Sequence, residues 1–210
     1  MASSLIHMAI ASELNKKLNK DNKSILIGSI APDISRQINN TKRLSHFITD
    51  NTEIPDLNKF LSIYKPYLND DFVLGYYIHL YTDYIWEKYF ITDYIKDNGI
   101  YDINNNLIHL TSNEIIKYIY NDYTNLNMQV INNYKLDINV LKSNHPTFNN
   151  IIKEIPMNKL NIIINKTIEI INNSKENKAY LFDITNISKF INFCINALLD
   201  DLKNLGIYKV

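Results

Sequence analysis

Apolar side chains recur at intervals of three and four residues along most of this chain, and polar or proline-containing breaks separate the resulting stretches. This spacing is typical of helices that bury one face. We therefore expect an all-α fold. The predicted helices span residues 4–20, 55–68, 72–95, 112–133, 147–155, 158–173 and 187–205.

Residues with good capping chemistry precede several of these helices. Ser3 or Ser4 can cap the first one, and Asn69 or Asp70 can cap the helix that begins at residue 72. Residues 111–114 read Thr-Ser-Asn-Glu, which is the capping-box pattern. The side-chain oxygens at such positions accept hydrogen bonds from the first backbone N–H groups of a helix. The helix starts are therefore predicted with more support than the helix ends.

Two segments between the helices are open to more than one interpretation. Residues 24–30 form a short apolar run that could be a strand on its own. Pro32 disfavours helix at the preceding residue, so Asp33 begins a new element or lies on a turn. Residues 38–54 are polar and irregular, which predicts a long loop that carries His46.

Length and composition limit the class of protein. We expect one domain over residues 1–210, arranged as a multi-helix bundle, because 210 residues with 46% hydrophobic side chains can bury a sizeable core. The chain has 22 basic and 22 acidic residues, so no overall charge attracts a nucleic acid, and no stable nucleic-acid partner is indicated. Neither a secretory signal nor a transmembrane segment is visible, which predicts a cytoplasmic protein.

Five residues have the chemistry and spacing of a buried metal site. His79 and Asp83 are four residues apart, so a helix places them on the same face. Asp33 and His46 lie in predicted loops, and His7 lies in the first turns of the first helix. Imidazoles and carboxylates bind divalent ions, which can activate a water molecule for hydrolysis. Each residue alone could instead be a buried histidine or a helix cap, but the set predicts a metal site.

The motifs around these residues resemble those of a known family. Residues 28–33 read Gly-Ser-Ile-Ala-Pro-Asp, residues 45–47 read Ser-His-Phe, and residues 75–83 contain both His79 and Asp83. In order and approximate spacing they resemble the bacterial zinc-dependent phospholipase C family and its single-strand nuclease relatives. The resemblance covers residues 1–90, so we expect that part of the chain to form most of the metal site.

The resemblance implies an all-helical hydrolase of phosphodiester bonds with zinc near its middle. It implies that Asp33, His46, His79 and Asp83 hold one Zn²⁺, and that Asp83 bridges to a second ion also bound by His7. It also implies that Asp33 is the catalytic general base. One or two zinc ions are expected, although such ligands bind other divalent metals too. The chain lacks the family's His-x-x-x-Glu pair, so the third zinc site of the family is absent or rebuilt.

Several other polar residues have open roles. Glu87 follows Asp83 by one helical turn and could be an additional ligand, an acceptor for an imidazole N–H, or the partner of a surface lysine. His109 and His145 have no partner at ligand spacing and are interpreted as exposed or turn histidines. Cys194 lies in an apolar stretch and is interpreted as a small buried residue.

The expected function is therefore metal-dependent hydrolysis of a phosphoester, with a phospholipid or a nucleotide as the substrate class. The alternative is a non-catalytic, metal-stabilised helical protein with a binding or regulatory role, which would unfold when its metal is removed. A His-Asp phosphohydrolase would also be helical and metal-dependent, but the chain has no adjacent His-Asp dipeptide.

Overall fold

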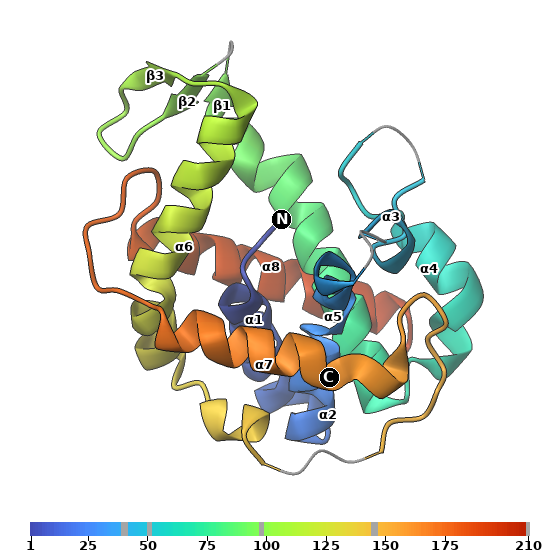
Figure 1. Cartoon of the computed structure of the whole chain (residues 1–210). Coiled ribbons are helices and arrows are strands. Elements are labelled where there is room, and N and C mark those ends of the chain that lie inside the picture. The colour runs from blue at the N-terminus through green and yellow to red at the C-terminus, as the bar shows by residue number, and fades with distance from the viewer. Residues whose placement is uncertain (39–41, 50–51, 97–98, 144–146, 209–210) are drawn as a thin grey trace.

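Helix α5 (Asp71–Ile85) lies in the middle of the fold, where it packs against α1 (Ser4–Leu18), α2 (Asn22–Gly28), α4 (Leu57–Tyr64) and α8 (Ile184–Asn204) (Figure 1). The computed structural model describes residues 1–38, 42–49, 52–96, 99–143 and 147–208. Its other α-helices are α3 (Lys42–Ser45), α6 (Ser112–Tyr134) and α7 (Leu160–Asn172). Helix accounts for 66% of the structure and strand for 4%, which confirms the predicted all-α class.

The central position of α5 follows from its composition. Its residues are apolar or aromatic at most positions, and nearly all of them are buried, as in a helix that is covered on several sides. Asp70 caps it by accepting hydrogen bonds from the backbone N–H groups of Phe72 and Val73. The α-helix ends at Ile85, ten residues before the predicted end, and the chain continues as a π-helical turn, η3 (Trp86–Phe90). The prediction of one helix over 72–95 is therefore wrong in its second half.

Two glycines allow α2 and α5 to pack very closely. A Cβ atom added at Gly28 would overlap the backbone carbonyl oxygen of Phe72, and one added at Gly75 would overlap that of Ile25. Only glycine permits this distance between two helix backbones. The close packing brings the C-terminal end of α2 beside the middle of α5, where His79 lies.

The second half of the chain packs onto the first. Helices α6 and α8 contact α1, and α7 contacts the 3₁₀ helix η1 (Ala31–Gln37) (Figure 1). Thr111 and Glu114 form the predicted capping box at the start of α6. Among the described residues, no helix combines the length and apolar character that a membrane crossing requires.

The structure decides several open or incorrect expectations of secondary structure, and the loop predicted over 38–54 is wrong at α3 (Lys42–Ser45). Residues 24–30 mostly belong to the helix α2 and form no strand. Residues 147–155 are irregular, and Tyr64 explains part of this, because its hydroxyl donates to Glu154 Oε2 at 2.6 Å and accepts from the Lys153 N–H at 3.1 Å. Such contacts hold the backbone in a non-helical course. The α-helix predicted over 55–68 covers only Leu57–Tyr64 and continues as a 3₁₀ turn.

A small antiparallel sheet lies beyond the start of α6, at one end of the molecule (Figure 1). Its strands, in the order β1-β2-β3, are Ile95–Lys96, Gly99–Tyr101 and Leu107–His109. Strands of two or three residues are too short for an alternating pattern to be recognised in the sequence. The sheet was therefore not among the predicted elements.

Asp122 of α6 fixes the segment that leads into α8. Its buried carboxylate accepts hydrogen bonds from three consecutive backbone N–H groups, those of Tyr180, Leu181 and Phe182, at 2.5 to 3.0 Å. Replacing Asp122 with alanine leaves these donors without their acceptor. We expect the free energy of unfolding to fall by about 2 kcal/mol, measured by urea denaturation. An unchanged denaturation midpoint would show that water replaces the carboxylate without cost.

Candidate metal centre

The structure brings all five predicted ligands together. His7 comes from α1, Asp33 from η1, and His46 follows α3, while His79 and Asp83 lie one turn apart on α5. Their side chains are fully buried except that of Asp33, which belongs to a residue that is 7% exposed. Burying five such side chains side by side costs free energy unless they pair with one another or with a shared cation.

The distances between the donor atoms fit the coordination of a small divalent ion. His79 Nε2 lies 3.1 Å from His46 Nε2 and 3.3 Å from Asp83 Oδ2. His7 Nε2 lies 3.3 Å from Asp83 Oδ1, and His46 Nε2 lies 3.6 Å from Asp33 Oδ1. Zinc bonds of about 2.0 to 2.1 Å place tetrahedral ligands about 3.3 Å apart. The cluster therefore has the spacing of a zinc ligand set.

Hydrogen bonds fix which nitrogen of two of these rings carries the proton. His79 Nδ1 lies 2.8 Å from the carbonyl oxygen of Ser29, and His46 Nδ1 lies 3.2 Å from that of Lys42. A carbonyl oxygen only accepts, so Nδ1 is the donor in both rings. In the neutral rings the Nε2 atoms then carry lone pairs, which is the form that binds metals.

When both rings are neutral and protonated at Nδ1, their Nε2 lone pairs face each other. At 3.1 Å, the Nε2 atoms of His46 and His79 repel unless a cation or a shared proton lies between them. Four further buried atoms of the five ligands have no hydrogen-bond partner among the described residues, namely His7 Nδ1, His7 Nε2, Asp33 Oδ1 and Asp83 Oδ2. Orphaned donors and acceptors of this kind indicate a missing ligand at their centre.

Electrostatics keep most of these groups in the metal-binding form. Burial lowers the pKa of His7 to about 4 and also lowers the pKa of His46, which favours neutral rings. Burial would raise the pKa of Asp83, but the neighbouring His7 and His79 hold it well below its usual range. His79 is the exception: burial lowers its pKa, but the charge and hydrogen bond of Asp83, together with Asp33 and the Ser29 carbonyl, raise it above its usual value. Ionised carboxylates among mostly neutral imidazoles are suited to a divalent cation.

The donor atoms form two groups that share one histidine. His7, His79 and Asp83 make up one group, and Asp33, His46 and His79 make up the other. The rings of His7 and His79 stack with centroids 3.8 Å apart, and His79 Nε2 also lies 3.1 Å from His46 Nε2 in the other group. The two oxygens of Asp83 face different histidines, Oδ1 towards His7 and Oδ2 towards His79, as a bridging carboxylate would. Two adjacent ions would fit this arrangement.

Glu87 has a different partner from those considered in the sequence. It forms an ion pair with the amino group of Met1, and it belongs to neither ligand group found among the described residues. The same N-terminal segment reaches the site, because the Ala2 N–H donates to Asp83 Oδ1 at 3.0 Å. Glu87 therefore holds this segment near Asp83, and the lysine pairing is wrong.

His109 and Cys194 belong to neither ligand group. His109 is an exposed residue of β3, as interpreted from the sequence, and His145 lies outside the described residues. Cys194 is fully buried, which confirms its assignment to the core, and burial raises the pKa of its thiol to about 12.

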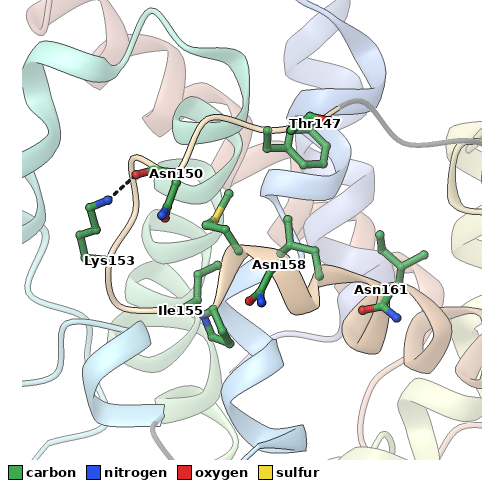
Figure 2. Close-up of a pocket in the computed structure, with 11 residues that line it drawn as sticks. Thr147, Asn150, Lys153, Ile155, Asn158 and Asn161 are labelled. Atoms are coloured by element: carbon green, nitrogen blue, oxygen red, sulfur yellow. Dashed lines mark hydrogen bonds between the residues drawn. The ribbon is translucent and has the colours of Figure 1, made fainter.

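Two pockets adjoin the metal centre and a third lies elsewhere. A pocket of about 260 Å³ is lined by Asp33 and Arg36, and one of about 560 Å³ is lined by Arg36 and Glu87. Figure 2 shows a different pocket, of about 680 Å³, whose walls come from residues 147–164 and include none of the five ligands. The pocket of about 260 Å³ therefore borders the ligand set directly through Asp33, and the pocket of about 560 Å³ borders it through Arg36, whose Nε lies 3.3 Å from Asp33 Oδ1.

Sequence reasoning missed three groups around the ligands. Arg36 lies three residues after Asp33, and its Nε is 3.3 Å from Asp33 Oδ1. The carbonyl of Ser29 and the hydroxyl of Ser45 hold His79 and His46. The i, i+3 spacing of Asp33 and Arg36 could have predicted their ion pair. A contact made by a backbone carbonyl cannot be predicted in this way, because every residue has a carbonyl group.

Ser45 offers a test of this arrangement. Its hydroxyl donates to the Lys42 carbonyl at 3.2 Å and therefore accepts from His46 Nδ1, which is 2.8 Å away. We expect Ser45→Ala to weaken zinc binding by about 10-fold, because the His46 ring loses an orienting partner. Competition with a chromogenic chelator measures this, with Ser62→Ala, an exposed serine of α4, as the control. Equal zinc affinity in all three proteins would contradict it.

Comparisons with known proteins do not identify a family. No protein-family model matches the chain, and searches of curated proteins and of solved structures find no match either. The resemblance to zinc-dependent phospholipase C thus stays a prediction from the motifs that contain Asp33, His46, His79 and Asp83. The chemistry of the site has to be inferred from its own side chains.

Proposed function

We propose that this protein is a metal-dependent hydrolase of phosphoester bonds that resembles zinc-dependent phospholipase C, with one or two Zn²⁺ ions held by His7, Asp33, His46, His79 and Asp83. The observation that carries the proposal is the pair of facing Nε2 atoms of His46 and His79, 3.1 Å apart beside two carboxylates. A cytoplasmic location is part of the proposal.

Arg36 supports a phosphoester as the substrate. Its guanidinium pairs with Asp33 and its side chain is 30% exposed, so it lies at the border between the ligand cluster and solvent. Arginine binds phosphate oxygens in a planar, two-pronged geometry. Both pockets beside the site are lined by Arg36, so a phosphoryl group bound there would have room for a substituent on each side.

In hydrolysis, the oxygen of water bonds to phosphorus, the phosphorus–oxygen ester bond breaks, and the departing alcohol oxygen receives a proton. A divalent ion supplies Lewis-acid activation of the water and of a phosphoryl oxygen. Asp33 is the most accessible of the five ligands and is placed to accept the proton of water. Arg36 holds a phosphoryl oxygen as negative charge develops on it.

The larger adjoining pocket suggests what one side of the substrate is made of. Its walls include the apolar side chains of Trp86, Ile91, Ile115 and Ile119, and Arg36 is among its charged residues. An apolar wall with a few polar groups at one end binds an amphiphilic ligand. This favours a phospholipid or another ester of an apolar alcohol, and leaves a nucleotide as the second substrate class.

The test uses bis(p-nitrophenyl) phosphate as a generic phosphodiester. We expect the zinc-loaded protein to hydrolyse it and the chelator-treated protein not to. Arg36→Met should lower kcat/KM by about 10- to 100-fold, because the phosphoryl contact is lost, and the zinc content of the same sample reports any effect of losing the ion pair with Asp33. Arg43→Met removes the same chemical group outside the site and should keep the activity. Equal activity of Arg36→Met and wild type would contradict the role of Arg36.

A second candidate function is a metal-stabilised helical protein with a binding or regulatory role. The complete burial of His7, His46, His79 and Asp83 favours it, because structural sites are closed whereas catalytic sites keep an open position. In that case the protein would bind zinc and unfold on chelation, yet hydrolyse no phosphodiester. The same assay therefore separates the two functions.

A further inference from the structure

The pocket of about 260 Å³ beside Asp33 is built from four parts of the chain. Ser4 comes from the start of α1, Arg36 from η1, Asn127 from α6 and Lys166 from α7. Asp33 is its link to the metal centre, since it is the one predicted ligand that lines this pocket. A group bound here would therefore be attached to the phosphorus that reacts at the centre.

Two buried polar side chains in this pocket have unused hydrogen-bonding capacity. Ser4 is 8% exposed, and its hydroxyl has no hydrogen-bond partner among the described residues. Asn127 is 2% exposed; its Nδ2 donates to Ser174 Oγ at 3.1 Å, but its Oδ1 accepts from no described residue. Neither oxygen is fully enclosed by protein, so both are open to the pocket that their residues line, where a polar ligand can bond to them. Such a ligand would find the Ser4 hydroxyl, which can donate or accept, and Asn127 Oδ1, which can accept.

The charges of the pocket define that ligand further. Arg36 and Lys166 are its basic residues, and Asp33 is the acidic residue that lines it. Asp33 is already paired with Arg36 and faces the histidines, so it is not free to pair with a cationic ligand. Lys166 forms an exposed ion pair with Glu169 at 2.9 Å, which a ligand can replace at little cost.

We propose that this pocket binds a polyhydroxylated alcohol, the polar half of the phosphoester substrate; this rests on the proposed hydrolase function. A ligand hydroxyl can donate to Asn127 Oδ1 and accept from Ser4 in the same position, which other neutral groups do less well. A neighbouring hydroxyl can accept from Lys166. A quaternary ammonium group would offer no hydrogen bonds and would meet two cations, so the pocket discriminates against it.

The two adjoining pockets then have different tasks. The polar pocket takes the polyol, and the larger apolar pocket takes the other substituent, with Arg36 between them. A volume of about 260 Å³ lies just below the range for drug-sized ligands and suits one sugar-sized ring. The polyol could belong to a lipid or to a soluble diester, and both present the same hydroxyl groups.

A matched pair of soluble substrates tests the proposal. Glycerophosphoinositol and glycerophosphocholine share the glycerophosphate half and differ in the second alcohol. We expect the zinc-loaded protein to hydrolyse the inositol ester with kcat/KM about 10-fold or more above that of the choline ester. Phosphatidylinositol and phosphatidylcholine in detergent micelles form the second arm. Stronger preference in that arm identifies the lipid as the source of the polyol.

A variant ties the preference to the pocket. Ser4→Ala removes the free hydroxyl but not the helix cap, which is provided by Ser3. We expect the inositol-to-choline ratio to fall about 5- to 10-fold, as for one lost hydrogen bond. The exposed Ser62→Ala is the control and should keep the ratio.

The outcomes separate this proposal from the function on which it rests. Equal hydrolysis of both esters, or a ratio unchanged by Ser4→Ala, would overturn the polyol pocket while leaving the hydrolase in place. Failure to hydrolyse any of these esters and bis(p-nitrophenyl) phosphate, at full zinc content, would overturn the hydrolase and the polyol pocket together.

Discussion

Replacing Gly28 or Gly75 with alanine is expected to lower the free energy of unfolding by about 3 kcal/mol or more, which corresponds to about 10 °C in Tm for a chain of this length. The new methyl group would overlap a backbone carbonyl oxygen, of Phe72 for Gly28 and of Ile25 for Gly75. Since a backbone oxygen cannot rotate away, α2 and α5 would have to separate along their whole contact. Urea denaturation followed by circular dichroism measures the loss.

Gly206→Ala is the matched control for this prediction. Gly206 follows α8 with a φ of +77°, and a Cβ there meets no atom within 4 Å. The substitution adds backbone strain but no overlap, so we expect a loss of about 1 kcal/mol. If Gly28→Ala and Gly75→Ala cost no more than Gly206→Ala, the helices can separate freely and the close packing is not important for stability.

The same close packing links the fold to the site. Gly28 ends α2, and the carbonyl of the next residue, Ser29, orients His79 on α5. A forced separation of the two helices would move this carbonyl away from the ring. We therefore expect Gly75→Ala to weaken zinc binding as well as stability, although Gly75 contacts no ligand atom.

Sequence patterns were sufficient to predict features that depend on residues close together in the chain, such as helix caps and pairs on one helix face. Thr111, and either Asn69 or Asp70, were predicted as helix caps because their side chains can accept from the first turn of a helix; Asp70 and Thr111 are the caps in the structure. The spacing of His79 and Asp83 places them on one face of α5, where they lie 3.3 Å apart. These inferences depend on neighbours within four residues along the chain.

Sequence patterns were insufficient to predict features that depend on contacts between segments far apart in the chain. Residues 147–155 look helical, yet Tyr64 holds Lys153 and Glu154 through its hydroxyl, which lies about 90 positions earlier in the sequence. The sequence of the short α2 resembles a strand because five of its residues are apolar or small. Its packing against α5 explains this composition, and that packing cannot be read from the sequence. The polar pocket was likewise missed, because Ser4 and Asn127 carry no sequence signal of their own.

Removal of His79 is expected to abolish metal binding altogether. His79 is shared by both ligand groups, whereas His7 belongs to one and His46 to the other. By elemental mass spectrometry we expect one to two zinc ions per wild-type chain, fewer in His7→Ala or His46→Ala, and none in His79→Ala. His109→Ala, which removes an exposed histidine of β3, is the control and should retain the full content.

The loss of metal should also lower stability. An ion present at 100 to 1,000 times its Kd stabilises the folded state by about 3 to 4 kcal/mol, so chelation should lower Tm by about 10 °C. Asp83→Asn keeps the shape of the side chain and removes its charge, so its metal-free form should fold while binding zinc weakly. A chelator should therefore lower the Tm of the wild type strongly and the Tm of Asp83→Asn only slightly.

One result would overturn the metal centre itself. If the wild-type protein contains no metal and takes up none when zinc, manganese and cobalt are supplied, the facing nitrogens of His46 and His79 must share a proton instead. The buried charge would then be one imidazolium between Asp33 and Asp83. Under that outcome Asp83→Asn would lower stability by removing the partner of a buried cation, and chelation would leave the Tm of the wild type unchanged.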